Sequence, residues 1–255
     1  MTKKTIWLIV LIICSGMFIA SLIYFLNLYL DSKKIENLRD DVSVSSQQDT
    51  TDKKEDKTVE VPIDFDKLEK ANPDIYAWIS IPEVNVDYPI LQSESDNGYY
   101  LNHTVNGQKS VYGSIYTEDY NSKDFSDFNT LVYGHNINMK NGTMFGSLKK
   151  YRDAEFFKNN RFITVYMPGR ILKYEIFAAY TWDNKHVLLT RNFETGYNRT
   201  AYIEEIFAVR DMKSQINKEI TVTESDKIIT LSTCMGDKSK RFLVSGVLVY
   251  DSAKD

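Results

Sequence analysis

The chain has 255 residues, of which 43% are hydrophobic and 13% aromatic, enough to bury one substantial core. Its formal net charge is -4 and its pI is near 5.5, so it has no general electrostatic attraction to polyanions. Nucleic acid is therefore not expected as a partner, because affinity for the phosphate backbone requires clustered positive charge.

The N-terminal segment is apolar. Thr5–Leu30 contains no charged residue, and it is longer than the roughly 20 apolar residues that cross a bilayer as a helix. A cleaved signal peptide is the alternative, but its apolar core is typically only about 7–15 residues long. We therefore expect residues 1–30 to hold one transmembrane anchor. Lys3 and Lys4 favour a cytoplasmic N-terminus, although two lysines beyond the segment weaken this charge argument.

The next segment, Asp31–Glu60, contains no aromatic residue and no glycine, and it is rich in charged and small polar residues. Such a composition buries too little apolar surface to offset the entropy lost on ordering. We expect a disordered polar stalk over residues 31–60. The remaining residues, 61–255, have a length that suits a single domain. A cytoplasmic N-terminus would make this domain extracellular.

Short β-branched and aromatic runs, bounded by Gly, Asn, Asp and Pro, recur after residue 61 and predict strands. Their number predicts a mainly β fold, a closed or nearly closed antiparallel barrel. The candidate strands are Ala77–Ile81, Tyr88–Leu91, Ser114–Thr117, Thr130–Gly134, Phe162–Met167, Leu172–Trp182, Glu219–Val222, Lys227–Thr233 and Arg241–Tyr250.

Helical patterns interrupt these strands. Phe65–Lys70 follows Asp64, a residue type that caps helices, and stops before an Asn-Pro pair that disfavours helix. Between Thr200 and Lys213, apolar residues recur at helical spacing and predict a helix that packs on the barrel. Shorter helices are predicted at Gly98–His103, Met144–Tyr151 and Ala154–Asn159.

The cysteines are the first candidates for chemistry. Cys14 lies in the predicted anchor and cannot pair with Cys234, which leaves Cys234 as a lone thiol. A small buried hydrophobe is the simple interpretation of such a residue. However, the run Ile228–Thr233 brings Cys234 to a strand end, and a turn then leads to Arg241 at the start of the next strand. If these strands pair as a hairpin, Cys234 and Arg241 face one another.

In that arrangement the Arg241 guanidinium would favour the thiolate and donate hydrogen bonds to an oxyanion, although an ordinary surface charge is the alternative. A cysteine nucleophile also needs a proton-transfer partner, most often histidine. His135 ends the apolar run Leu131–Gly134 at another predicted strand end, whereas His103 and His186 fall in loop or turn segments. Position alone therefore favours His135.

These residues also resemble a known family. Thr230–Cys234 followed by Arg241, together with the upstream motif Tyr133–Asn136, is similar to the signature of sortases. Sortases are bacterial surface enzymes that cleave a sorting signal and join the protein to the cell envelope. Asn72–Ile79 and Val86–Ile90 extend the resemblance over most of the folded region, and the anchor and stalk match the usual plan of the family.

The subclass resembles class B, because a helical region precedes the first strand and a long helix precedes the cysteine-bearing strand. The resemblance implies a closed barrel of about eight strands with flanking helices, preceded by one transmembrane helix. Seven positions separate Cys234 from Arg241, which leaves Lys238 or Lys240 as alternative oxyanion donors. Arg241 is preferred because it begins the strand and offers a planar donor fork.

The resemblance implies a cysteine transpeptidase. Cys234 would form a thioacyl enzyme with the threonine of a C-terminal sorting signal, and His135 would transfer protons. Arg241 would stabilise the tetrahedral intermediates. Ser232, Asn97 and Leu101 would contact the substrate, although structural roles are equally open for these three.

The implied partners are surface proteins bearing NPxTN-like or SPxTG-like signals, a peptidoglycan precursor amine, and the membrane through the N-terminal helix. The chemistry requires no metal or organic cofactor, and the sequence contains no His/Cys cluster typical of a zinc site. Two other functions use the same residues differently: a cysteine peptidase that hydrolyses surface peptides, and a non-catalytic surface-binding domain with an inert Cys234.

Overall fold

The computed structural model describes residues 3–43, 59–137, 143–235 and 237–254. The chain forms two compact units that divide between Val44 and Ser45. The first unit is helix α1 (Lys3–Ser43), in which Lys3–Asn27 is long and apolar enough to cross a membrane.

Helix α1 therefore continues beyond the predicted anchor, and residues 31–43 of the predicted stalk are helical. Residues 44–58 of that stalk lie outside the described residues. The boundaries of the anchor, the stalk and the extracellular domain stay predictions.

The second unit is built mainly of β-strands. Its strands are β1 (Ile75–Ile81), β2 (Val86–Leu91), β3 (Ile115–Tyr116), β4 (Asn129–Tyr133), β5 (Asn136–Ile137), β6 (Thr143–Met144), β7 (Phe162–Met167), β8 (Arg170–Asp183), β9 (Gln215–Ile216), β10 (Ile228–Cys234) and β11 (Lys240–Asp251). Strands β5 and β6 form a separate two-stranded sheet. The others form one sheet in the order β11-β10-β4-β3-β2-β1-β7-β8-β9.

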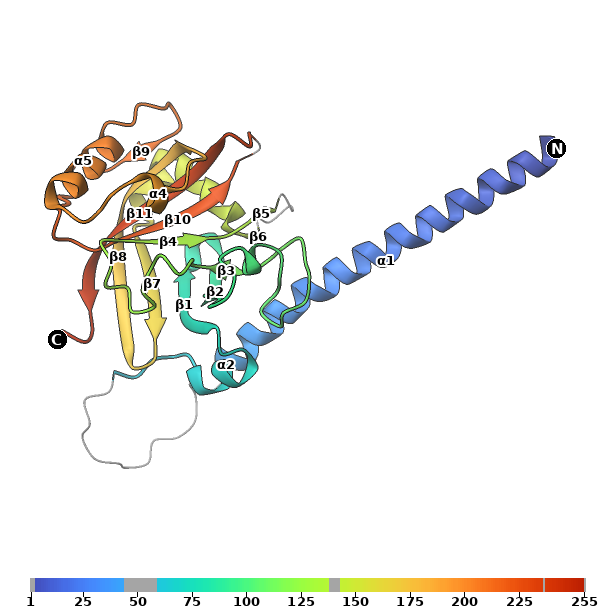
Figure 1. The fold of residues 1–255 in the computed structure, drawn as a ribbon, viewed down its shortest axis with the longest axis horizontal. Coiled ribbons are helices and arrows are strands. Elements are labelled where there is room, and N and C mark those ends of the chain that lie inside the picture. The colour runs from blue at the N-terminus through green and yellow to red at the C-terminus, as the bar shows by residue number, and fades with distance from the viewer. Residues whose placement is uncertain (1–2, 44–58, 138–142, 236, 255) are drawn as a thin grey trace. The chain divides into compact units, whose positions relative to one another are not determined.

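That sheet closes on itself because β8 pairs with β11 as well as with β7 (Figure 1). All of its strands except β9 belong to the ring, which makes an eight-stranded barrel. The predicted closed, mainly β fold is confirmed. Two pairs in the ring, β2 with β3 and β4 with β10, are parallel, whereas the sequence suggested an antiparallel sheet throughout.

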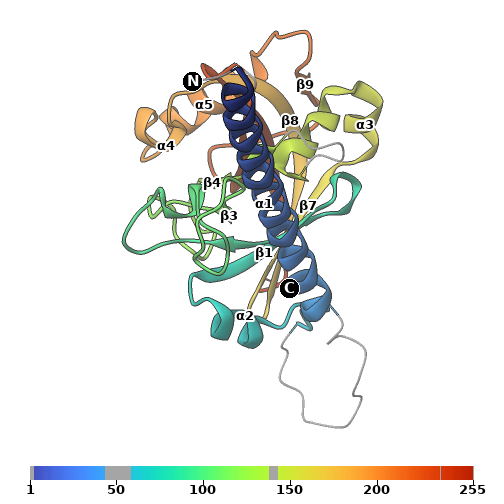
Figure 2. The ribbon, with the colours of Figure 1, turned by 90° about the vertical axis from the view of Figure 1, so that its right-hand side faces the viewer.

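Helices flank the barrel, as predicted. They are α2 (Phe65–Ala71), α3 (Ala154–Asn159), α4 (Val187–Thr190) and α5 (Gly196–Phe207), with 3₁₀ segments η2 (Pro82–Val84), η3 (Tyr99–Leu101) and η4 (Phe145–Arg152). Asp64 caps α2 by accepting a hydrogen bond from the Lys67 backbone at 3.0 Å. Figure 2 shows α4 and α5 to one side of the barrel and α3 on the other.

The helices predicted at Gly98–His103 and Met144–Tyr151 form as the 3₁₀ segments η3 and η4. One further helix and one strand are placed differently from the prediction. The helix predicted over Thr200–Lys213 is α5, which begins earlier because the Thr195 side chain caps it, accepting from the Asn198 backbone at 3.3 Å. The strand predicted at Glu219–Val222 does not form, and the short strand β9 pairs with β8 instead.

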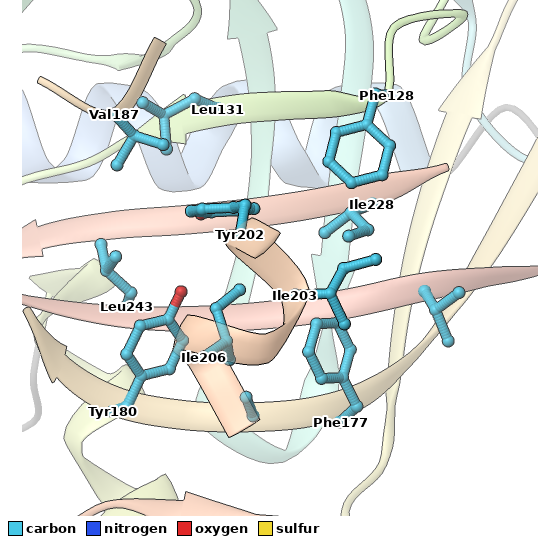
Figure 3. Packing of buried hydrophobic residues seen from close by; sticks show 12 residues of the cluster. Phe128, Leu131, Phe177, Tyr180, Val187, Tyr202, Ile203, Ile206, Ile228 and Leu243 are labelled. Carbon is cyan, nitrogen blue, oxygen red and sulfur yellow. The ribbon is translucent and has the colours of Figure 1, made fainter. Parts of the chain in front are cut away.

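Helix α5 covers the outer face of the barrel over β8, β10 and β11 (Figure 3). Tyr202, Ile203 and Ile206 of α5 are all buried there, and burial of such side chains stabilises the fold by about 1.5–3 kcal/mol each. The part of β10 that α5 covers ends before the strand itself ends. Along this face of β10, Thr230 and Ser232 are buried, whereas Cys234 is exposed.

An ion pair joins the start of β8 to the end of β11. Arg170 donates to both carboxylate oxygens of Asp251, at 2.8 Å each, and the Asp251 side chain is only 5% exposed. These hydrogen bonds hold the pKa of the Asp251 carboxyl below its ordinary value. The pair therefore stabilises the fold above the unfolded carboxyl pKa of about 3.9, and this stabilisation is lost as pH falls through the lower folded pKa.

We expect Asp251→Asn to lower the free energy of unfolding at pH 7 by about 1.5–3 kcal/mol, the net value of hydrogen bonds to a charged group. Urea denaturation of both proteins at pH 7 and at pH 2.5 measures the effect. The difference between wild type and variant should shrink at pH 2.5. An equal difference at both pH values would show that the carboxylate charge is not what stabilises the pair.

Candidate active site

Strand β10 lies between β4 and β11, and the predicted catalytic residues lie around its C-terminal end. Ser232 is opposite Tyr133 in the parallel pairing with β4, and the Gly134 backbone donates to the Ser232 carbonyl at 3.1 Å. His135 is two residues beyond Tyr133, and Cys234 is two residues beyond Ser232. The two residues therefore leave adjacent parallel strands at the same end.

On the other side of β10, Cys234 is directly opposite Arg241 of β11. Directly opposed residues of an antiparallel pair have their side chains on the same face of the sheet. The predicted hairpin thus brings the thiol and the guanidinium to one face. Trp182 of β8 is opposite Arg241 in the next pairing and extends this row.

Cys234 is exposed, which does not fit the alternative of a small buried hydrophobe. Its backbone is held at the strand end, because the Asn136 side chain donates to the Cys234 carbonyl at 2.7 Å. This contact joins the residue after His135 to the cysteine itself. The chain segments that carry the imidazole and the thiol are therefore fixed to each other.

His135 is held through its own ring. Nε2 donates to the backbone carbonyl of Leu101, at 2.6 Å, because a carbonyl can only accept. In the neutral ring this leaves Nδ1 as the proton acceptor. The predicted substrate contact Leu101 is thereby placed next to the histidine, with its side chain 47% exposed.

Gly134 explains how the chain reaches this position. A Cβ atom on residue 134 would lie 2.5 Å from the Ile115 side chain and 2.6 Å from the Phe145 ring. Only glycine allows β4 to pass so close to these two buried side chains. The glycine before His135 in the motif therefore has a packing reason.

Arg241 is half-buried, and its Nη1 donates to the backbone carbonyls of Lys238 and Lys240 at 3.4 Å and 3.2 Å. Lys240 is next to Arg241 in β11, so its side chain points to the opposite face of the sheet. Lys238 lies in the exposed turn before the strand. Of the three cations, Arg241 is the one in register with Cys234.

Comparison with known proteins agrees with this fold. The sortase domain model matches residues 79–249. Sortase B of Listeria monocytogenes is 35% identical over 193 residues, covering 74% of this chain and 76% of the relative. The chain belongs to the sortase family, in class B.

Solved class B sortases resemble this sortase in three dimensions. The Bacillus anthracis enzyme in complex with AAEK1 matches with a TM-score of 0.72 and 31% identity, covering 88% of this chain and 99% of that one. A Staphylococcus aureus sortase B–substrate complex matches with a TM-score of 0.63 and 30% identity, covering 72% of this chain and 84% of that one. The sortase-type barrel expected from the sequence is confirmed.

The residues of this sortase that were predicted to contact the substrate lie in two different places. Ser232 is 5% exposed and shares the Cys234 face of β10, two residues back. Asn97 is hydrogen-bonded to Asp119 instead, with Nδ2 donating to the carboxylate at 2.6 Å and the Asp119 backbone donating to Oδ1 at 2.8 Å. The structure brings Ser232 and Leu101 next to the predicted catalytic residues and gives Asn97 a surface partner.

Two tyrosines beside the set were not predicted. Tyr133 of β4 stacks on Tyr116 of β3 with ring centroids 5.3 Å apart. Burial raises the pKa of both hydroxyls, and the charge of Glu118 raises each pKa further, whereas Arg241 lowers them. Both rings therefore lie within electrostatic reach of Arg241. The sequence marked Tyr133 only as part of the motif, because its packing depends on β3.

Proposed function

We propose that this class B sortase cleaves a C-terminal sorting signal of surface proteins after its threonine and transfers the protein to an amine of peptidoglycan. The observation that carries the proposal is the exposed Cys234, with Arg241 opposite it on β11 and His135 just beyond the end of β4. Nucleophile, proton carrier and anion-stabilising cation thus lie around the end of β10, between its two neighbouring strands.

In the first half-reaction, His135 takes the proton of the Cys234 thiol, and the resulting thiolate attacks the threonine carbonyl carbon and forms a C–S bond. The carbonyl electrons move to oxygen, and the Arg241 guanidinium stabilises the resulting oxyanion. When the intermediate collapses, the C–N bond breaks, and His135 gives a proton to the departing amine. The products are a thioester on Cys234 and a released C-terminal peptide.

In the second half-reaction, the amine of a peptidoglycan precursor attacks the thioester. His135 accepts a proton from this amine as the new amide bond forms, and the Cys234 thiolate leaves. Water can replace the amine, and the same residues then act as a peptidase. Selection between transfer and hydrolysis depends on how well an amine competes with water for the thioester.

The preferred signals are proposed to be NPxTN-like or SPxTG-like. Ser232 and Leu101 line the peptide path, a role supported by their positions beside Cys234 and His135. For Asn97 to bind the peptide, its amide must exchange the hydrogen bonds with Asp119 for bonds to substrate. This exchange makes Asn97 the weakest contact of the three.

The membrane arrangement is part of the proposal. The apolar part of α1 anchors the enzyme with the N-terminus in the cytoplasm, residues 31–60 act as a stalk, and residues 61–255 form the extracellular catalytic domain. In this arrangement the enzyme meets secreted surface proteins and the cell-wall precursor on the same side of the membrane.

Intact-mass spectrometry of the full chain in detergent tests the proposal. The protein is mixed with Asn-Pro-Gln-Thr-Asn and Ser-Pro-Gln-Thr-Gly peptides, with and without triglycine as the amine. A thioacyl adduct that resolves to an amide product would establish transpeptidation. An adduct that only hydrolyses identifies a peptidase, and no adduct together with an alkylation-resistant Cys234 would identify a binding domain.

We expect Arg241→Ala to lower kcat/KM for cleavage of the peptide by about 10²–10³-fold, because the oxyanion loses its charged donor. Arg241→Lys should recover only part of this rate, since an ammonium lacks the planar donor fork. Lys240→Ala, a neighbouring cation on the opposite sheet face, is the matched control. If Lys240→Ala loses as much rate as Arg241→Ala, the assignment of the oxyanion donor is wrong.

A further inference from the structure

A second histidine lies beside the catalytic set without belonging to it. His186 directly precedes α4, and its Nε2 is hydrogen-bonded to the carboxylate of Glu118, which follows β3. The Tyr133 hydroxyl is 3.1 Å from the same nitrogen. The His186 and Glu118 side chains are 25% and 14% exposed, so water only partly screens their interaction.

The hydrogen bonds of His186 show which ring nitrogen carries the proton. The Leu189 backbone donates to Nδ1 at 3.3 Å, so Nδ1 is the acceptor. Nε2 then carries the hydrogen of the neutral ring and donates it to Glu118. One side chain thus caps α4 through Nδ1 and ties α4 to the barrel through Nε2.

Hydrogen bonds from the barrel hold the backbone of Glu118 in place. The buried side chain of Gln92 donates to the Glu118 carbonyl at 2.9 Å and to the Thr117 hydroxyl at 3.1 Å. The Thr117 backbone in turn donates to the Leu91 carbonyl of β2 at 2.9 Å. The backbone that carries the Glu118 carboxylate is therefore held by contacts that do not involve α4.

The connection between β8 and α4 is tied at two further points. The Asn184 side chain donates to the Lys238 carbonyl, in the turn that follows Cys234, at 3.3 Å. Val187 is buried against β4, and Figure 3 shows its side chain beside Leu131. The segment 184–190 therefore extends from the turn after the nucleophile to the end of β3.

This segment borders the same sheet face as the catalytic cysteine. Tyr133, which contacts His186, is opposite Ser232 in the β4–β10 pairing, two residues before Cys234. Tyr120 adds a ring to the other side of His186, edge-on at 5.5 Å between centroids. Segment 184–190 and Tyr133 thus form one wall on the sheet face that carries Cys234, and the bond between His186 and Glu118 holds that wall to the segment after β3.

We propose that the Glu118–His186 hydrogen bond is a latch that sets the position of this wall for the sorting-signal peptide. Glu118 and His186 are then positioning residues, acting through Tyr133 and segment 184–190 and not on the reacting atoms. The inference rests on the proposed function for its substrate. Without the latch, the wall samples several positions, and peptide binding has to select the competent one.

The test measures kcat and KM for the full chain in detergent with the Asn-Pro-Gln-Thr-Asn peptide. His186→Asn keeps a residue type that caps helices but cannot reach Glu118. We expect KM to rise roughly tenfold, which corresponds to about 1.4 kcal/mol, with kcat changed less than about threefold. Glu118→Ala should do the same, whereas Glu118→Gln, whose amide oxygen still accepts from Nε2, should stay within about threefold of wild type.

The double variant His186→Asn/Glu118→Ala should be no worse than either single variant, because both remove one interaction. Glu175→Ala is the control, since it breaks a comparable ion pair with Arg161 at β8 and should leave KM unchanged. An unchanged KM in His186→Asn and Glu118→Ala, or a double variant whose losses add, would overturn the latch.

Hydrogen exchange separates failure of the latch from failure of the proposed function. Amides of residues 184–190 should exchange faster in His186→Asn and Glu118→Ala than in wild type, with or without peptide. If wild type forms no adduct with the peptide, the proposed function fails and the positioning role falls with it. If exchange is unchanged in both variants, the latch itself is refuted whatever the enzyme acts on.

Discussion

Cys234→Ala is expected to abolish both the thioacyl adduct and cleavage of the sorting peptide. The proposed mechanism forms its only covalent bond to substrate through this sulfur, and alanine offers no nucleophile in its place. Loss of a covalent nucleophile removes nearly all of the rate enhancement, because the other members of the set act only on the bond that it makes. Intact-mass spectrometry and a fluorogenic Asn-Pro-Gln-Thr-Asn peptide measure the two effects.

Cys14→Ala is the matched control, because it makes the same chemical change in α1. The chain has two cysteines, so this variant leaves Cys234 as its one thiol. It should retain full turnover, and iodoacetamide should then modify a single, exposed site. Cleavage that persists in Cys234→Ala, or an adduct that is lost in Cys14→Ala, would remove Cys234 from the proposed role.

The strands near the site could be predicted because their local patterns agree with their packing. The β-branched run before Cys234 forms β10, and the run that begins at Arg241 forms β11, with the two residues opposite one another. A hairpin is local in sequence, so a turn between two strand patterns is enough to predict its pairing.

The errors have a common cause, which is that an apolar pattern reports burial and not backbone geometry. Val209 belongs to the predicted helical face and packs on the core, but α5 has already ended at Phe207. Ile220 and Val222 suggested a strand, and they also pack on that core from a segment without strand structure. Capping residues and strand partners decide whether an apolar segment becomes a helix, a strand or a loop. Thr195, which caps α5, is a sequence signal that could have placed the start of this helix.

The position of His135 required more than local pattern. The parallel pairing of β4 with β10 joins segments about a hundred residues apart, and nothing in either run specifies it. The family resemblance supplied what periodicity could not. Neither the local pattern nor the family resemblance indicated the Glu118–His186 contact. Both residues lie outside regular strands, and only the folded barrel brings them together.

His135→Ala is expected to lower kcat/KM for the Asn-Pro-Gln-Thr-Asn peptide by about 10²–10⁴-fold, the usual contribution of a positioned proton-transfer group. The reason is specific: an amine leaves the tetrahedral intermediate only when it takes up a proton, and His135 is proposed to supply it. A peptide in which the scissile amide is replaced by a thiophenyl ester has a leaving group that needs no proton. His135→Ala should therefore lose much less rate with the thioester than with the amide.

His103→Ala is the matched control, because His103 also lies beside η3 and bonds to a backbone carbonyl, that of Tyr99 at 2.7 Å. It should leave both substrates unaffected. Equal losses with amide and thioester in His135→Ala would contradict a role in leaving-group protonation, and would instead place His135 at the step that the two substrates share, formation of the attacking thiolate. The ratio of the two losses thus decides which proton His135 moves.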